Sequence, residues 1–145
     1  GVGLAYTRLS LREQRWNEQN VSVRRYFAKG SLGVETIGIG HSLRRPISDR
    51  AIEQIFADDI ADTEKELLAR APWVADLDEA RQGALLNMAF NLGVAGLLGF
   101  HATLEAIQRG DYFMAAAHMM DSTWAKQVGV RAERLAEQMR SGEWQ

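Results

Sequence analysis

The chain has 145 residues, of which 46% are hydrophobic and 25% are charged, and its formal net charge at pH 7 is −2. A chain of this size and composition suits one globular domain with a hydrophobic core of its own. A net charge this small argues against a protein whose whole surface binds nucleic acid. The sequence has no cysteine, which excludes a disulfide framework and a thiolate metal site, and no apolar run approaches the roughly 18 residues of a membrane helix.

The charges are distributed unevenly along the chain. Residues 1–45 hold eight basic side chains and three acidic ones, so the rest of the chain has a net charge of −7. A basic first third suits an anionic polymer, and it equally suits an ordinary solvated surface. The opening segment GVGLAYTRLSLR lacks the basic-then-apolar order of a signal peptide, so we expect no secretory leader in it.

The first third of the sequence predicts one short helix and two short strands. The segment LSLREQRWNEQ, residues 9–19, is typical of a helix. VSVRRYFAK at 21–29 alternates and is rich in strand-forming residues, GSLG supplies a turn, and VETIGIG at 34–40 alternates again. We therefore expect a small β-hairpin sheet after an N-terminal helix.

A long helix is predicted after Pro46. Ser48 is placed to cap it, and Asp49 lies in the first turn, where the helix dipole favours a negative charge. Pro72 lies where the helix must end. We expect a helix over about 48–70 that connects two halves of the protein. Its apolar positions recur every three to four residues at Ile52, Ile55, Phe56, Ile60, Thr63 and Leu67.

The second half is predicted to be a helical bundle. Its first helix, DEARQGALLNMAFNLG from Asp78, is apolar around most of its circumference, so other helices must nearly surround it, and Gly93 ends it with a left-handed cap. Shorter amphipathic helices follow in HATLEAIQRG, DYFMAAAHMMDS and VRAERLAEQMRSG. The expected fold is α+β and mainly α: a helix with a small sheet, a long connecting helix and a helical bundle, forming two lobes with a groove between them.

Two stretches of the sequence carry a family resemblance. TIGIGH at 36–41 matches a hairpin signature that ends in Thr-Ile-Gly-(Ile/Val)-Gly-His, and a longer match runs from Leu77 through RQGALLNMAFNLGVAGLLGF to STWAKQVGVRAERLAEQMRSGEW. Both resemble the phage-type lysozymes, glycoside hydrolase family 24, and ISDRAIEQIFADDI is similar to the inter-lobe helix of that family. The resemblance implies a single lysozyme-like domain over 1–145. Its parts would be the helix and hairpin lobe at 1–47, the inter-lobe helix at 48–71 and the helical lobe at 72–145.

The resemblance also implies a chemistry, the cleavage of glycosidic bonds in peptidoglycan. This reaction usually takes a protonated carboxyl group that donates to the leaving oxygen and an ionised one across the sugar. The family places its Glu in a Glu-Gly motif at the end of the first helix, its Asp shortly before the hairpin turn, and then its Thr. In this chain the first aspartate is Asp49. The catalytic Asp of the family is therefore missing.

Glu18 is the candidate for the acid. An alignment without gaps back from Thr36 puts Val21 and Gly30 at the positions of the family's Glu and Asp. If this chain instead has a few extra residues in the first strand or its turn, the segment RWNEQ aligns with the family motif Arg-x-x-Glu-Gly. Glu18 would then end its helix, where the dipole disfavours a carboxylate and keeps the proton bound to higher pH. The alternative interpretation of Glu18 is an ordinary solvated carboxylate on the helix surface.

Two other carboxylates are weaker candidates. Glu13 lies five residues before Glu18, on a different face of the predicted helix. Glu35 precedes Thr36 in an extended segment, so the two side chains should point to opposite faces of the sheet and cannot both line one cleft.

The resemblance gives roles to four further residues. Thr36 would position a water molecule, while Asn91, Gln127 and Arg131 would line the cleft and bind substrate. Arg131 is at the position of a family arginine that approaches the catalytic Glu. Because a threonine cannot serve as a strong base, activity should be low or altered if Glu18 and Thr36 are the whole machinery.

We expect no metal and no cofactor, because the three histidines lack metal-ligand spacing and no HExxH motif is present.

The leading hypothesis is a muramidase from a phage or prophage lysis or tail module. It would be a monomer, made in the bacterial cytoplasm, that acts on peptidoglycan glycan strands in the cell wall. The alternative is a catalytically impaired protein of the same fold that binds peptidoglycan or a protein partner, and the missing Asp favours it. A third possibility, a nucleic-acid binder using the basic first third, predicts salt-sensitive retention on DNA, and we do not expect it.

Overall fold

A computed structural model describes residues 24–29, 33–38 and 41–145 of the chain. The chain divides into two compact units, Gly1–Ala51 and Ile52–Gln145, and each is considered by itself below. The helix expected at 9–19 lies outside the described residues. The expected division of one domain at residues 47 and 71 stays a prediction.

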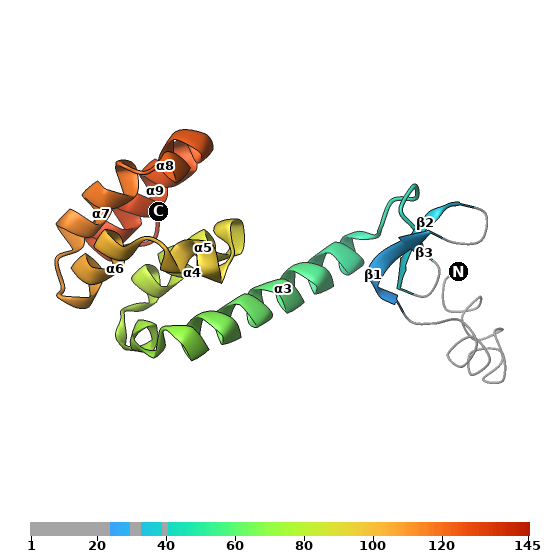
Figure 1. The fold of residues 1–145 in the computed structure, drawn as a ribbon, viewed down its shortest axis with the longest axis horizontal. Helices are drawn as coiled ribbons and strands as arrows, with labels where there is room; N and C mark the ends of the chain where they lie inside the picture. The colour runs from blue at the N-terminus through green and yellow to red at the C-terminus, as the bar shows by residue number, and fades with distance from the viewer. Residues whose placement is uncertain (1–23, 30–32, 39–40) are drawn as a thin grey trace. The chain divides into compact units, whose positions relative to one another are not determined.

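The described part of the first unit is a three-stranded antiparallel sheet (Figure 1). Its strands are β1 (Arg24–Lys29), β2 (Glu35–Gly38) and β3 (His41–Ser42), in the order β1-β2-β3. The predicted hairpin corresponds to β1 and β2. The third strand was not predicted because two residues are too few to show an alternating pattern. Gly38 ends β2 with φ of 66°, a conformation that favours glycine and lets the chain reverse toward β3.

The long helix α3 spans Asp49–Arg70, close to the predicted bounds. The Oγ of Ser48 accepts a hydrogen bond from the backbone N–H of Ala51 at 3.1 Å, which is the predicted N-cap. The apolar stripe of the helix is unevenly buried. Leu67 is only 2% exposed because it enters the core of the second unit, whereas Ile52 and Phe56 are 49% and 56% exposed.

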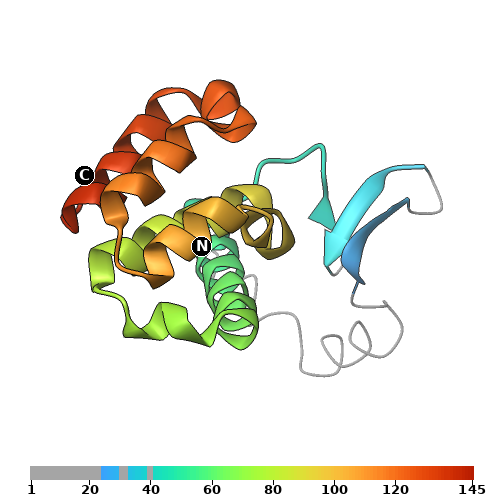
Figure 2. The same cartoon turned by 60° about the vertical axis from the view of Figure 1, so that its left-hand side comes forward.

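The second unit continues from α3 into a short 3-10 helix and six further α-helices over the described residues that follow (Figures 1 and 2). The elements after α3 are η1 (Pro72–Asp76), α4 (Glu79–Leu92), α5 (Val94–Leu98), α6 (His101–Gln108), α7 (Tyr112–Met120), α8 (Thr123–Val128) and α9 (Val130–Ser141). The mainly helical α+β class is thus confirmed. The sequence analysis did not separate η1, α5 and α8, since five or six residues are too few for a helical period to emerge.

Short polar side chains begin three of these helices. Asp78, Asp111 and Ser122 each accept a hydrogen bond from a backbone N–H in the first turn of α4, α7 and α8 respectively. Each cap satisfies one of the amide groups that a helix start leaves without an intrahelical partner. The chain can therefore change direction abruptly between short helices.

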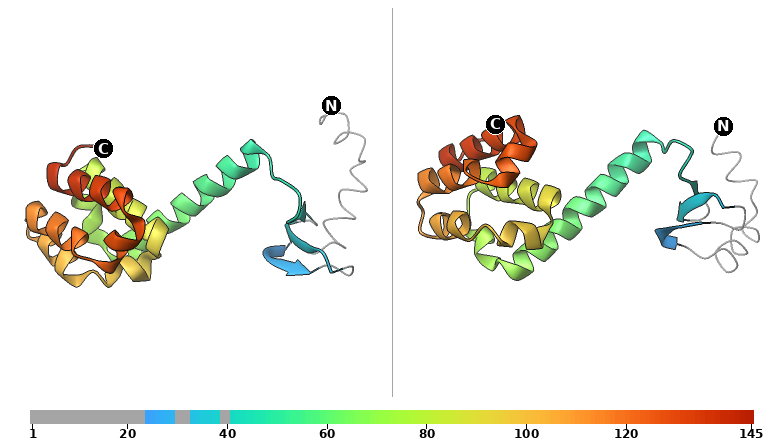
Figure 3. Two further views of the ribbon diagram at one scale, coloured as in Figure 1. Left: turned by 90° about the horizontal axis from the view of Figure 1, so that it is seen from above. Right: turned by 45° about the horizontal axis from the view of Figure 1, so that its top comes forward.

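One contiguous core holds the second unit together. Leu85, Met88, Leu97 and Met119 are fully buried in it, along with Ile107, Met139 and a set of alanines. Alanine positions let the helices approach closely, and the flexible methionines fill the irregular spaces that remain. Figure 3 shows α7 and α9 side by side in this unit. No helix within the described ranges is both long and apolar enough to cross a membrane.

Helix α4 differs from its prediction in two respects. One side is buried through Ala84, Leu85 and Met88, but Phe90 is 43% exposed, so the helix is not nearly surrounded. Gly93 does end the helix with a positive φ of 81°, as expected of a glycine cap. Its ψ of 154° places it outside the left-handed helical region, and Gly93 leads straight into α5.

Arg81 ties α4 to the C-terminal end of α9. Its Nε donates to the carbonyl of Met139 at 2.6 Å and its Nη2 donates to the carbonyl of Arg140 at 3.0 Å. The guanidinium also lies 3.5 Å from the ring centroid of Tyr112, at the start of α7. One planar cation thus satisfies carbonyl groups at the end of α9 and joins three helices.

Candidate functional site

Thr36 lies on the middle strand of the sheet. Its partners in register are Ala28 on β1 and Ser42 on β3. The side chain of Thr36 is partly buried, whereas its neighbours Glu35 and Ile37 are exposed. Glu35 and Thr36 therefore point to opposite faces, as the alternation of an extended segment predicts. The sheet therefore places the Thr36 side chain on one face and the Glu35 side chain on the other.

The proposed acid, Glu18, lies outside the described residues, as does the weaker candidate Glu13. Their roles stay predictions. In the second unit the structure describes three residues to which the resemblance gave a role, namely Asn91, Gln127 and Arg131.

Asn91 lies in the last turn of α4, where it is bonded to a buried tryptophan. Its Oδ1 accepts a hydrogen bond from Nε1 of Trp124 at 3.0 Å. Trp124 is 3% exposed and packs edge-on against Phe100, with ring centroids 6.2 Å apart. Since a buried indole N–H needs an acceptor, this bond fixes the orientation of the exposed Asn91 side chain.

Gln127 and Arg131 lie on either side of the sharp turn between α8 and α9. Gly129 forms this turn with φ of 60° and ψ of −119°, a conformation that strongly favours glycine. Both side chains are exposed, and neither makes a hydrogen bond or ion pair with another residue in the part of the chain that the structure describes. They are available to a ligand.

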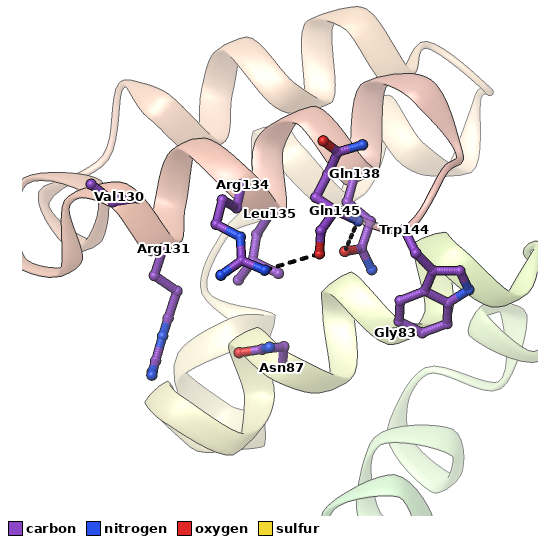
Figure 4. Close-up of a pocket in the computed structure, with 9 residues that line it drawn as sticks. All are labelled: Gly83, Asn87, Val130, Arg131, Arg134, Leu135, Gln138, Trp144 and Gln145. Carbon is purple, nitrogen blue, oxygen red and sulfur yellow. Dashed lines mark hydrogen bonds between the residues drawn. The ribbon is translucent and has the colours of Figure 1, made fainter.

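A pocket of about 440 Å³ lies between α4 and α9 (Figure 4). Arg131 lines it, but Asn91 and Gln127 do not. The complete lining is Gly83, Asn87, Val130, Arg131, Arg134, Leu135, Gln138, Trp144 and Gln145. Two arginines enter it from α9, and no acidic side chain is among the described residues that line it. The pocket therefore offers hydrogen-bond donors and positive charge to a polar or anionic group.

One buried and one exposed hydrogen bond connect residues of the pocket wall to α4 and to the last residue of the chain. Gln138 is 4% exposed, and its Nε2 donates to the carbonyl of Ala80 at 2.6 Å. The Nη2 of Arg134 donates to the carbonyl of Gln145 at 3.0 Å, and Figure 4 shows both side chains turned toward the last residues of the chain. Arg134 is thereby bonded to the last residue of the chain, while Arg131 remains unpaired among the described residues.

The indole of Trp144 forms another wall of the pocket. Its ring lies directly on Gly83 of α4, where a Cβ atom would come within 2.3 Å of the ring carbon Cη2. Only a glycine accommodates this contact without movement. Trp144 is nevertheless 65% exposed, so it presents an aromatic ring to solvent while it lines the same pocket as the two arginines.

The sequence analysis gave no role to Asn87, Arg134, Gln138 or Trp144. A signal for part of the set was present, because positions 131, 134 and 138 share one face of a helix. The contact of Trp144 with Gly83 had no such signal, since it joins segments far apart in the sequence. Among the described residues, no three acidic or histidine side chains are placed to hold a metal ion.

Comparison with known proteins identifies sequence relatives of this chain. The sequence model of the phage lysozyme family matches residues 18–141. The pre-baseplate central spike protein Gp5 of Enterobacteria phage T4 is 28% identical over 157 aligned positions, which cover 88% of this chain and 27% of that protein. Two probable T4-type lysozymes of Dictyostelium discoideum are 27% and 31% identical over 72% and 46% of this chain. The chain spans less than two thirds of the length of each of these relatives, 66% and 39% for the two lysozymes.

Proposed function

Because the chain belongs to the phage lysozyme family, we propose that it hydrolyses the glycosidic bonds of bacterial peptidoglycan. The observation that carries the proposal is the extent of the family match, which runs from residue 18 to residue 141 and includes all five proposed site residues. The relatives named as T4-type lysozymes support the same activity.

In the proposed mechanism, Glu18 is the general acid. It donates its proton to the oxygen of the leaving sugar as the glycosidic bond breaks. Thr36 holds the attacking water through its hydroxyl, from a strand paired on both sides. The water oxygen bonds to the anomeric carbon and releases one proton to solvent, from which Glu18 regains the proton that it donated. General acid catalysis alone contributes about 10²- to 10⁴-fold, so one carboxyl group suffices for a slow enzyme.

The second unit supplies substrate binding in this proposal. Arg131 and Gln127, near the turn at Gly129, have donors that no described residue engages, and Asn91 presents an amide whose orientation Trp124 fixes. Peptidoglycan carries hydroxyl, acetamido and carboxylate groups, which these donors and acceptors suit.

A second candidate function is a protein of the same fold that binds peptidoglycan, or a protein partner, without cleaving it. The specific observation that favours it is the position of the first aspartate, Asp49, which lies after the hairpin rather than shortly before the hairpin turn. Without a second carboxyl group, neither a nucleophile nor a strong base is available from that position.

A cell-wall clearing assay separates the two functions. We expect the wild type to clear a suspension of purified bacterial walls, and Glu18→Gln to lose at least about 100-fold in rate, as expected for the loss of a general acid. Glu13→Gln is the matched control and should clear at the wild-type rate. Sedimentation of all three proteins with walls that remain intact would instead support the binding function.

One of the relatives suggests a context for this activity. It is named as a pre-baseplate central spike protein of phage T4, and the aligned part covers 27% of its length. We propose that the present protein belongs to a phage or prophage lysis or tail module, is made in the bacterial cytoplasm and acts on the cell wall.

A further inference from the structure

Another pocket of the second unit, of about 430 Å³, lies where the turn between α6 and α7 meets η1. Its size is within the range of about 300–1,000 Å³ that is typical of sites for small ligands. It has no described lining residue in common with the pocket between α4 and α9. We call it the η1–α6 pocket. Its lining is Trp73, Asp76, Leu77, Ile107, Gln108, Arg109, Gly110 and Tyr112.

Two aromatic side chains line this pocket from different segments of the chain. Trp73 comes from η1 and Tyr112 from the start of α7, and both are half-buried and pack against the core of the second unit. The guanidinium of Arg81 also lies over the ring of Tyr112, 3.5 Å from its centroid. Neighbouring residues therefore hold both rings, while part of each ring stays accessible. Such rings offer apolar surface with a negative face to the C–H groups of a sugar ring.

Several polar groups of the pocket have no partner among the described residues. Asp76 and Gln108 are exposed, and their side chains make no hydrogen bond or ion pair within the described ranges. The indole N–H of Trp73 and the hydroxyl of Tyr112 likewise make no hydrogen bond there. The pocket thus presents a carboxylate, an amide, a hydroxyl group and an indole N–H that a ligand can engage.

Hydrogen bonds hold the backbone on both sides of the pocket. On the η1 side, Nε2 of Gln82 donates to the carbonyls of Ala75 and Leu77, at 3.0 and 2.8 Å. Asp76 lies between these two residues. On the other side, Gly110 follows α6 with φ of 80° and donates its N–H to a carbonyl of that helix at 3.0 Å. A pocket with walls already formed loses little freedom when it binds a ligand.

Positive and negative charge are balanced in the lining. Among the described lining residues, Asp76 supplies the one negative charge and Arg109 the one positive charge. Nη2 of Arg109 lies 3.8 Å from Oδ2 of Asp111, an exposed ion pair beyond hydrogen-bond distance that leaves the guanidinium donors available to a ligand. A charged ligand would meet a group of its own sign, whereas a neutral polar ligand can use both groups. The pocket between α4 and α9, with its two arginines, suits an anionic group instead.

The η1–α6 pocket lies apart from the proposed substrate-binding residues of the second unit. Tyr112 is the first residue of α7, whereas Gln127 and Arg131 flank the turn after α8, beyond the other end of that helix (Figure 1). Arg81, which contacts Tyr112, and Asn91 are about 15 Å apart along α4 at the helical rise per residue. A ligand in this pocket is therefore held at a separate place.

We propose that the η1–α6 pocket binds an N-acetylated sugar unit of a glycan strand, as an attachment point in addition to the proposed cleft. A pyranose ring has a C–H face for the two aromatic rings and hydroxyl groups for Asp76 and Arg109. Its acetamido group adds a carbonyl and an N–H for the amide of Gln108. The methyl group of the acetamide suits the apolar floor at Ile107, which is 2% exposed. This inference takes its ligand from the proposed function but requires no cleavage.

Titration with N,N′,N″-triacetylchitotriose, followed by NMR, tests the proposal. We expect the indole N–H resonance of Trp73 to shift and to reach saturation. Asp76→Ala and Gln108→Ala should each weaken the affinity read at this resonance by about tenfold, as expected for one lost hydrogen bond. Gln54→Ala removes an exposed amide on α3 and is the matched control, with unchanged affinity. Circular dichroism checks that the variants keep their helices. A Trp73 resonance that does not respond, or equal affinity in all variants, would overturn the proposal.

A charged probe and a cleavage assay complete the test. The charged tripeptide Ala-Glu-Lys is the second probe, and a Trp73 resonance that responds to it but not to the trisaccharide would contradict a neutral sugar ligand. The release of reducing ends from purified peptidoglycan is measured separately. A protein that binds the trisaccharide in this pocket but releases none would support this inference and contradict the proposed hydrolysis. A protein that cleaves walls while its Trp73 resonance does not respond to the trisaccharide would contradict this inference alone.

Discussion

Asn91 and Trp124 are joined by a hydrogen bond of 3.0 Å that connects a proposed substrate-binding residue to the core. Because Trp124 is buried, losing the acceptor leaves its indole N–H without a partner. We expect Asn91→Leu to lower the free energy of unfolding by about 1–3 kcal/mol. Urea denaturation measures this value. Asn91→Asp keeps an acceptor oxygen and should stay closer to the wild type; equal losses in both variants would show that the bond contributes little.

Whether Gly83→Ala raises or lowers the stability of the protein should depend on Trp144, which is far from it in the sequence. Alanine is favoured over glycine in a helix by about 0.5–1 kcal/mol. In a Trp144→Ala background, Gly83→Ala should therefore stabilise the protein by about that amount. With Trp144 present, the new Cβ would collide with the indole ring, and the gain should shrink or reverse. The double-mutant cycle should show a clear coupling, and additive effects would mean that the ring does not rest on Gly83 in solution.

Arg81 is expected to tolerate neither neutralisation nor a change of shape. Lysine keeps the charge but lacks the fork that reaches two carbonyls and a ring at once. We expect Arg81→Lys to cost about 1.5–3 kcal/mol of stability, since a hydrogen bond to a charged group contributes about this much. Arg70→Lys, at an exposed ion pair on α3, is the matched control and should change stability by less than about 0.5 kcal/mol.

Arg131 should matter for binding and not for stability. It is exposed and makes no contact with a charged partner in the described residues, so Arg131→Gln should change the free energy of unfolding by less than about 0.5 kcal/mol. The retention of the Arg131→Gln variant on purified cell walls should nevertheless fall below that of the wild type, and this retention should depend less on salt concentration. Lys126→Gln removes an exposed charge of the same sign on α8 and serves as the control. Equal retention of the two variants would argue against a specific role for Arg131.

The long, regular parts of the fold were predictable from the sequence. The cap at Ser48, the period of α4 and the positive φ of Gly93 all follow from local chemistry that the residues themselves carry. The family prediction from TIGIGH and the C-terminal stretch is confirmed as well. The two-residue strand β3 was missed because it is too short to alternate, and the short helices η1, α5 and α8 were not separated because five or six residues are too few for a helical period to emerge.

The candidate site was predictable only in part. Arg131 and Arg134 share a helix face with Gln138, so a sequence pattern could have grouped them. The wall that Trp144 forms on Gly83 depends on packing between α4 and the last residues of the chain, and no local pattern encodes such a contact. The exposure of Phe113 and Met120 on α7 was also out of reach, because an apolar stripe on a helix is typical of a buried side.

The central claim is that the chain cleaves glycosidic bonds, and the products released from purified peptidoglycan test it most directly. The wild type should release soluble muropeptides with new reducing ends, Thr36→Val should release them more slowly, and Glu18→Gln should release almost none. Walls that bind the wild-type protein but yield no new reducing ends would contradict the claim.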